Sequence, residues 1–503
     1  MGGAHDEARP EEKAGGVVVR KEIPSDIASA AGLRPEDAAV VRDLCETYRR
    51  RLRRNYLRRG YYLMHQRPKE LGIAVPPHLR NLEQVVGWPA KAVDSLANRS
   101  QFDGFVSADE KATGDLARIA SENSLKRLYR QAVKSELQCC CSFLTVTAGE
   151  KGEPDVIVSA HPATAAAAIW DEHMRRIKAG MVVVDRDARP RHGDEPTWVD
   201  VFISDAVIRI KRDGTTRSWK AEYVWHSMGR PLMVPMAHEA TLERPFGKSR
   251  ISRAVMNITD DAMRASVRSE ISAEFFTSPQ KYLLGAEADA LEGMSKWDAY
   301  IGNIFAVSKD ADGDIPSFGQ LAQGSMQPHI DYMRSLAARF SGETNVPLSE
   351  LGVVTDNPSS AEAIYAAKEA LVIDAQNLNA DNGDALRDVA LMALAVVRGT
   401  DYATVAGEGL AVQAKFRNPA MPSVVSQSDA MVKMISVLPW MAESDVALEE
   451  LGFSDDQIQR LRSDRAKATS RALVASATQG TGLALPAANP EAAALQLASE
   501  AAR

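Results

Sequence analysis

Cysteine is scarce in this 503-residue chain, and long apolar runs are missing. The four cysteines are Cys45 and the adjacent Cys139, Cys140 and Cys141. That spacing is not the spacing of a zinc site or of a disulfide framework. Neighbouring side chains on a helix or strand point in different directions, so one metal ion could hardly collect all three adjacent thiols. We therefore expect reduced, mostly buried cysteines in a cytosolic chain.

Neither a signal peptide nor a membrane span is visible. The first 16 residues are polar and have no apolar core, so we expect no secretory leader. The longest apolar stretch, residues 389–397, is less than half of the roughly 20 residues that a membrane span needs. We expect no membrane partner.

The sequence also lacks the groupings that carry catalysis. FGKS at residues 246–249 resembles the end of a phosphate-binding loop, but that motif needs a glycine five positions before Gly247, where Leu242 stands. The nine histidines form no HxxxH or HExxH pair. We expect a turn and a helix start at Gly247, no enzyme activity, no catalytic or metal site and no cofactor.

A strong basic excess is absent as well. The net charge is −7 and the isoelectric point is near 5.8, so the whole chain shows no footprint of a nucleic-acid binder. The densest charge feature is RRRLRRNYLRR at residues 49–59. Arginines with interleaved tyrosines can hold phosphates, but a solvated helix face or pairing with acidic residues of a neighbouring subunit explains the run equally well. The candidate phosphate or subunit contacts are Arg50, Arg51, Arg53, Arg54 and Arg58.

What is present is a mainly helical α+β pattern, long enough for about three domains. Residues 1–22 are expected to be a disordered arm, and two long helices are expected at residues 37–59 and 82–99. Between residues 143 and 235, short β-branched and aromatic runs predict a largely antiparallel sheet, which one helix at residues 163–177 interrupts.

The C-terminal half returns to helix. A helix at residues 249–276 contains an Asp260–Arg264 pair four residues apart, and a small β-containing insert separates it from a second helix at residues 327–341. A loop then leads to NPSSAE at residues 357–362, a strong start for a helix that runs to residue 398. More helices are expected to residue 471, followed by a flexible, alanine-rich tail at residues 472–503.

Two ordered groups of motifs resemble portal proteins of long-tailed (siphovirus-type) double-stranded DNA phages. The first group comprises GRPLMVP at 229–235, FGKSRI at 246–251, DDA at 260–262, RSE at 268–270, AEFF at 273–276 and SPQKY at 278–282. The second comprises VP at 346–347, LG at 351–352 and NPSSAEAI at 357–364. VGW at 86–88, VDSL at 93–96 and GF at 104–105 are also similar to the family. Each run is short, and their order and spacing carry the resemblance.

The resemblance implies a portal-type fold. Its expected parts are a wing at residues 23–248, a stem of two helices at 249–276 and 327–341, a β-containing clip at 277–326, a tunnel loop with a long wing helix at 342–400, and a helical crown at 401–471. Expected stem residues are Arg253, Asp260, Arg264, Arg268, Met333 and Arg334. Expected DNA-facing residues of the tunnel loop are Glu343, Thr344, Asn345, Val346, Pro347, Asp356 and Asn357.

The resemblance further implies a head-tail connector: a ring of about twelve subunits at one capsid vertex, through which DNA is packaged and ejected. The implied partners are other copies of the chain, double-stranded DNA without sequence specificity, the terminase large subunit, a head-completion adaptor, and the major capsid and scaffolding proteins. The chain would be found in the virion, and in the host cytoplasm during assembly. The competing interpretations are another structural component, such as a minor head protein, and a nucleic-acid enzyme that depends on arginine.

Overall fold

The computed structural model describes residues 22–66, 84–187, 194–277, 281–284, 317–320, 324–352, 361–420, 424–453 and 455–478. It also describes two short paired strands near the start, β1 (Lys13–Ala14) and β2 (Val17–Val18). The rest of the arm expected at residues 1–22 lies outside the described residues. The chain divides into two compact units, one up to Ala420 and one from Met421. Helices and strands are mixed in an α+β arrangement, as expected.

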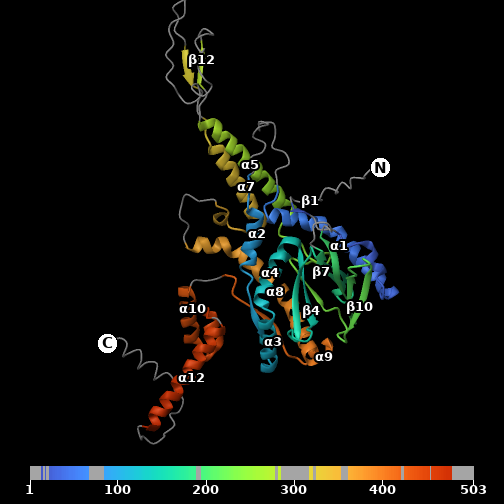
Figure 1. Cartoon of the computed structure of the whole chain (residues 1–503). Helices are drawn as coiled ribbons and strands as arrows, with labels where there is room; N and C mark the ends of the chain where they lie inside the picture. The colour runs from blue at the N-terminus through green and yellow to red at the C-terminus, as the bar shows by residue number, and fades with distance from the viewer. Residues whose placement is uncertain are drawn as a thin grey trace, which may run out of the picture. The chain divides into compact units, whose positions relative to one another are not determined.

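The helices of the first unit start where local chemistry favours helix (Figure 1). Pro35 stands in the first turn of the first long helix, followed by the acidic Glu36 and Asp37, which suit a helix N-terminus. Up to the first large sheet, the helices are η1 (Ser25–Ser29), α1 (Pro35–Tyr62), α2 (Trp88–Ala97), α3 (Glu110–Glu122) and α4 (Leu125–Cys139).

The second of the two expected long helices is shorter than predicted. Residues 84–87 are not helical, and α2 begins only at Trp88, directly before Pro89. Pro89 has no N–H to donate and fixes φ, which suits the first turn of a helix and no later position. A strand that the sequence did not indicate, β3 (Phe102–Val106), follows α2.

The expected antiparallel sheet exists as two sheets. One has five strands in the order β10-β9-β8-β7-β6, and the other has three in the order β11-β4-β5. All neighbours pair antiparallel. The strands are β4 (Cys141–Ala148), β5 (Val156–Pro162), β6 (Ala166–Asp171), β7 (Arg176–Asp187), β8 (Glu195–Phe202), β9 (Ala206–Arg212), β10 (Trp219–Trp225) and β11 (Met233–Ala237).

The helix expected at residues 163–177 is wrong, because strand β6 and the start of β7 occupy this segment. The alanines at 166–168 are good helix formers, but here their small side chains are buried and α1 packs closely against β6. Tyr48 donates to the carbonyl of Thr164 at 2.8 Å, and Asn55 donates to that of Ala163 at 2.9 Å. Tertiary packing therefore overrides the local preference.

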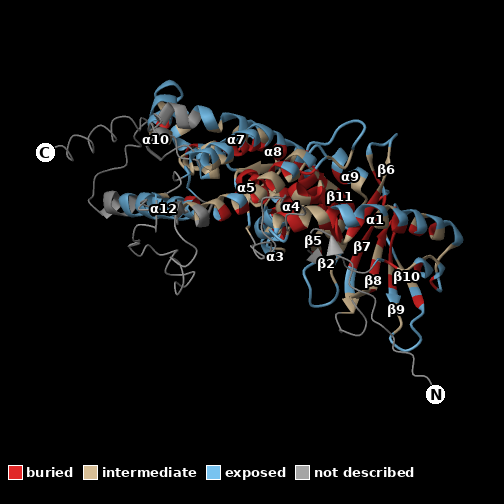
Figure 2. Cartoon of the chain, turned by 90° about the horizontal axis from the view of Figure 1, so that it is seen from above, coloured by how far each residue is buried: buried red, intermediate tan, exposed pale blue. Residues whose placement is uncertain are grey.

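Two hydrophobic cores hold the first unit together. In the smaller one, η1 and α1 cover one face of the five-stranded sheet. The larger one contains residues of α2, α3 and α4, of the three-stranded sheet and of three later helices. Figure 2 shows it as buried residues around α4, α8 and β11. These later helices are α5 (Arg253–Thr277), α7 (Gln327–Thr344) and α8 (Ala361–Arg398).

Helices α5 and α7 lie against each other along the chain's projecting part, as both the contacts and Figure 1 show. Between them, β12 (Lys281–Leu284) pairs antiparallel with β13 (Ser317–Gln320). The end of α5 and the start of α7 therefore meet at this paired tip, so the two helices run antiparallel. The remaining residues of the insert expected at 277–326 mostly lie outside the described residues.

The segment expected to start the crown at residue 401 belongs instead to the first unit. Helix α9 (Tyr402–Gly407) follows α8, and β14 (Gln413–Phe416) pairs antiparallel with β3, some 300 residues earlier in the chain. The second unit contains α10 (Val424–Val437), η5 (Pro439–Glu443), α11 (Asp445–Glu450) and α12 (Asp455–Thr478). Helix α12 extends past residue 472, where the flexible tail was expected to begin; residues 479–503 lie outside the described part.

Candidate functional site at the base of the helix pair

The motif at residues 246–251 builds the entrance to α5. Gly247 adopts φ +67°, and a Cβ atom there would lie 2.1 Å from the backbone oxygen of His238. The Lys248 N–H donates to that same oxygen at 2.8 Å. The Ser249 hydroxyl is buried and donates to the Gln138 carbonyl at 2.5 Å, near the end of α4. This serine and glycine therefore close a tight turn onto α4, which agrees with the expected turn and helix start.

Arg250 connects three separate helices. Its side chain is 6% exposed, and Nε donates to the carbonyl of Ala92 in α2 at 3.1 Å. Nη1 pairs with Asp374 of α8 at 3.1 Å, and Nη2 donates to the carbonyl of Thr344, the last residue of α7. Burial lowers the pKa of Arg250, and the neighbouring carboxylate of Asp374 opposes that shift. The guanidinium fork thus fixes the base of the helix pair.

The loop that follows α7 is fixed in place at its first residues. Asn345 adopts the left-handed conformation that ends the helix, with φ +54°, and its amide donates to Asp374 at 3.0 Å. Val346 and Pro347 are buried. Because Arg250 and Asn345 share the same Asp374 carboxylate, the end of α7 and the first loop residues form one polar cluster with α8.

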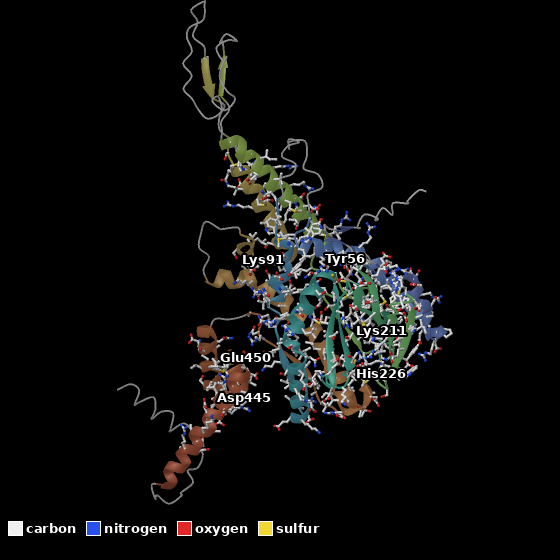
Figure 3. The ribbon with its side chains drawn as sticks, in the orientation of Figure 1. Tyr56, Lys91, Lys211, His226, Asp445 and Glu450 are labelled. Atoms are coloured by element: carbon white, nitrogen blue, oxygen red, sulfur yellow. The ribbon has the colours of Figure 1, made fainter. Side chains whose placement is uncertain are left out.

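A second cluster holds the short helix η4 (Leu348–Leu351) against α2. Glu350 accepts from the Ser95 hydroxyl at 3.0 Å, and it pairs with Lys91 at 3.2 Å and with Arg99 at 3.8 Å. Burial raises the pKa of Glu350, but these three partners outweigh it and hold the pKa below its ordinary value. Figure 3 labels Lys91 on α2. Residues 345–352 are therefore anchored at both ends.

This anchoring corrects part of the expected tunnel loop. Glu343 and Thr344 belong to the last turn of α7, because the helix continues three residues beyond the expected end. Thr344, Val346 and Pro347 are buried in the single chain, where they serve as anchors. Glu343 and Asn345 are exposed. Asp356 and Asn357 lie outside the described residues.

The expected stem residues fall into two groups. Arg253, Arg268 and Arg334 are exposed on α5 and α7, whereas Met333 is partly buried against the larger core. Asp260 accepts the Tyr61 hydroxyl at 3.0 Å, which ties α5 to α1, and Arg264 forms an ion pair with Asp261. Arg264 therefore pairs with the acidic residue three positions before it, next to Asp260 in α5.

The arginine run at residues 49–59 lies on α1. Arg50, Arg51, Arg53 and Arg54 are exposed, while Leu52 and Tyr56 on the same helix are buried in the smaller core. Figure 3 labels Tyr56 on this helix. Arg58 differs from the exposed four: it donates to the Cys139 carbonyl at 2.7 Å, and burial lowers its pKa. Four of the five candidate arginines are thus presented on the surface of a single chain.

The cysteines are free thiols, and Cys45, Cys139 and Cys141 are buried, as expected, while Cys140 is only partly buried. In the described parts of the chain, no cluster of three histidine, cysteine, aspartate or glutamate side chains is arranged to hold a metal ion. None of the described helices combines the length and apolar character needed to cross a membrane.

Sequence reasoning missed Arg250 as the central residue of this site. The signal was present but weak: a single arginine follows the serine of FGKSRI and precedes the apolar Ile251. Nothing local indicates that its partners are Ala92, Thr344 and Asp374, which come from three distant segments.

Comparison with known proteins gives the following likenesses. The chain is 25% identical over 444 residues to the portal protein of Mycobacterium phage L5, covering 85% of this chain and 88% of that protein. It is equally similar, at 25% over 444 residues, to the portal protein of Mycobacterium phage D29. No protein-family model matches the chain.

Among solved structures, a chain from the neck of an empty gene transfer agent particle has a TM-score of 0.40 and 12% identity, covering 73% of this chain and 87% of that one. A chain from the neck of the native particle has a TM-score of 0.38 and 12% identity, covering 73% and 89%. A structural likeness at this level carries no argument about function. The sequence comparison does not depend on these structures. It confirms the resemblance to phage portal proteins that the ordered motifs indicate, and it does so over most of the chain.

Proposed function

We propose that this chain is a portal subunit, the head-tail connector of a tailed phage, and that its copies form a ring around a channel for DNA at one capsid vertex. The observation that carries the proposal is the antiparallel pair α5 and α7, closed by the paired strands β12 and β13. This projection is built from the motifs that resemble the family, and the similarity to two portal proteins spans most of the chain.

In this proposal the anchored base of the projection has a mechanical role. Arg250 ties α2, α7 and α8 to the start of α5, so a load on the projection would pass into the larger core. A buried guanidinium that makes several hydrogen bonds to different elements resists displacement better than an exposed ion pair does. Glu343 and Asn345 are the exposed residues beside this base that would lie nearest to passing DNA.

The negative net charge of the chain suits a channel through which DNA passes. Each copy has a net charge of −7, so a ring of many copies is strongly negative and lacks the excess of lysine and arginine that makes DNA binding tight. At physiological salt, screening over about 8 Å keeps the repulsion short-ranged, and DNA can still enter. DNA would therefore pass without sequence-specific contacts. The exposed arginines of α1 would face a neighbouring subunit or the outer surface.

The further parts and partners follow from the same proposal. The β12–β13 tip would be the clip that meets the terminase large subunit during packaging and the head-completion adaptor afterwards. The body built on the two sheets would be the wing that contacts the capsid and scaffolding proteins. Residues 424–478 would form the crown. The protein would reside in the virion at the portal vertex, and in the host cytoplasm during assembly.

Electron microscopy tests the proposal. The full chain, purified and imaged in negative stain, should give uniform rings with a central hole. Compact particles of single-chain size at every concentration would contradict it. A control chain with Phe340→Asp, which places a charge in the buried contact of α7, should lose the rings together with the helix pair.

A further inference from the structure

Cys140 lies at a turn whose backbone favours glycine. It ends α4 with φ +111° and ψ −34°, and β4 begins at the next residue. Residues with a Cβ atom rarely adopt positive φ values. The Cys140 N–H donates to the Glu136 carbonyl at 2.8 Å, and the Cys140 carbonyl accepts from the His238 N–H at 3.1 Å. Strained backbone persists where the surrounding structure enforces it in this way, and it is frequent at functional sites.

This turn brings two sulfur atoms into contact. Adjacent side chains ordinarily point in different directions, but here the Sγ atoms of Cys140 and Cys141 lie 3.9 Å apart. The contact with Cys140, together with burial, raises the pKa of Cys141 well above its ordinary value. Cys141 therefore keeps its proton and can donate its S–H to a thiolate at Cys140. Solvent reaches Cys140, which is only partly buried.

Helix α1 supplies positive charge to the same turn. The Arg58 guanidinium lies within hydrogen-bonding reach of the Cys140 sulfur, and its Nη1 donates to the Cys139 carbonyl at 2.7 Å. Arg58 Nε is buried and has no hydrogen-bond acceptor among the described residues. A thiolate at Cys140 would give this guanidinium an acceptor. Arg51, which is exposed on the same helix, adds a second positive charge.

These neighbours favour the ionised form of Cys140. The hydrogen bond from Cys141 contributes most, and the charges of Arg58 and Arg51 add to it. Burial opposes them, and the net effect lowers the pKa of Cys140 to about 7. Burial instead raises the pKa of Cys139 to about 12, so that thiol stays protonated. Because the thiolate is the form that attacks disulfides, Cys140 should be the reactive thiol of this group.

The geometry also selects the product of such a reaction. Consecutive Cα atoms are about 3.8 Å apart, whereas those of disulfide-bonded cysteines are usually about 4.4–6.8 Å apart. A bond between Cys140 and Cys141 would therefore be strained and easily reduced. A bond from Cys140 to a small external thiol has no such constraint. The positive charge of Arg51 and Arg58 favours a thiol compound that carries carboxylates.

We propose that Cys140 is a modification site, which forms a mixed disulfide with a small acidic thiol compound. The Cys140 thiolate attacks one sulfur of a low-molecular-weight acidic disulfide, and the S–S bond of that reagent breaks. One half stays bonded to Cys140, which is oxidised. The other half leaves as a thiolate, is thereby reduced, and takes a proton from solvent. The reagent disulfide is the oxidant, so the reaction requires no other.

The proposed function supplies the occasion for this reaction, and only the occasion rests on it. A portal subunit is made in the reducing cytoplasm and then leaves the cell in the virion. Thiols stay reduced in the first environment, whereas disulfides persist in the second. Cys140 would thus carry a free thiol during assembly and the mixed disulfide in the released particle.

Oxidised glutathione, an acidic disulfide, tests the site in the full chain. Mass spectrometry of the intact chain and of its peptides should show a single glutathione on Cys140, which dithiothreitol removes. Cys140→Gly should take up none, and it should fold, because glycine suits the positive φ. The matched controls Cys45→Ser and Cys139→Ser should still take up one glutathione.

A charge swap on α1 tests the preference for an acidic reagent. Arg51→Glu should lower the ratio of the rate with oxidised glutathione to the rate with cystamine, a cationic disulfide, by about tenfold. A ratio of two rates on the same thiol does not change when a substitution alters only its reactivity. The matched control is Arg50→Glu, also at an exposed position on α1, and it should change the ratio much less.

Every other outcome has a defined meaning. Glutathione on another cysteine, no adduct, or a Cys140–Cys141 bond that retains no glutathione overturns the modification site. An unchanged rate ratio in Arg51→Glu overturns the preference for acidic reagents. Reaction only after assembled rings are dissociated shows that a neighbour covers Cys140, and overturns the site in the particle. Chains that take up glutathione but never form rings contradict the proposed function and leave the chemistry of Cys140 intact.

Discussion

A buried carboxyl group predicts how the stability of the first unit depends on pH. Glu136 of α4 is 0% exposed and accepts from the amide of Asn382 in α8 at 2.9 Å. That amide also donates to the Tyr129 hydroxyl at 3.2 Å. Glu136 Oε1 and Asn382 Oδ1 have no hydrogen-bond partner among the described residues, so the network lacks a donor, which a protonated carboxyl would supply. Loss of solvation raises the pKa of Glu136 to about 8.

The sign of the effect follows from linkage. The pKa of Glu136 is raised in the folded chain, so its stabilising contribution is fully present below the unfolded pKa and is lost as pH rises through the folded pKa. With an unfolded pKa of about 4.3 and about 1.36 kcal/mol per pH unit, raising the pH from about 5 to about 7 should cost roughly 2.5 kcal/mol.

Thermal unfolding at pH 5, 6, 7 and 8 measures this directly. Glu136→Gln keeps the shape of the side chain and cannot ionise, so its melting temperature should rise relative to the parent chain with each pH step. The total gain from pH 5 to pH 8 should be about 4 °C, because an unfolding entropy of about 2.1 cal/mol/K per residue gives a unit that extends to Ala420 a shift of roughly 1 °C per kcal/mol. The matched control Glu46→Gln, at an exposed position on α1, should show no such trend. Parallel pH curves for the parent and Glu136→Gln would refute the reasoning.

Three further predictions concern the site and the surface of α1. Arg250→Ala should lower the unfolding free energy by about 3–5 kcal/mol in denaturant titrations, because it leaves Asp374 without its buried partner, and a loss below about 1 kcal/mol would contradict the proposed connecting role. Gly247→Ala should give little soluble protein, since its Cβ would meet the His238 oxygen at 2.1 Å, and normal yield and melting temperature would show that the turn can relax. Replacing the exposed α1 arginines by alanine should weaken ring assembly, measured by sedimentation, more than DNA passage; normal rings would count against a subunit contact. These arginines are Arg50, Arg51, Arg53 and Arg54.

The sequence predicted those elements whose signal is local. The apolar periodicity located α5, α7 and α8 within a few residues, and the described part of α8 begins inside the NPSSAE motif at 357–362. The short β-branched runs located most strands of the two sheets. The prediction from sequence failed at residues 163–177, where an alanine-rich run forms a strand that packs against α1. Tyr48 and Asn55 of α1 donate hydrogen bonds to backbone carbonyls just before this strand.

The candidate site was less predictable because its contacts are long-range. Arg250 pairs with Asp374, which is 124 residues away, and no local pattern records such a pairing. The same holds for β14, whose pairing with β3 moves residues 401–420 from the expected crown into the first unit. Burial of Thr344 and Val346 also depends on tertiary packing, so the sequence could not separate anchoring residues from exposed ones in the loop.

A cryo-electron microscopy map of the assembled full chain would test the central claim most directly. The proposal predicts that the antiparallel pairs of α5 and α7 stand side by side around one open axis, with the β12–β13 tips together at one end. A particle in which these helix pairs point away from any common axis, or which has no central opening, would contradict it.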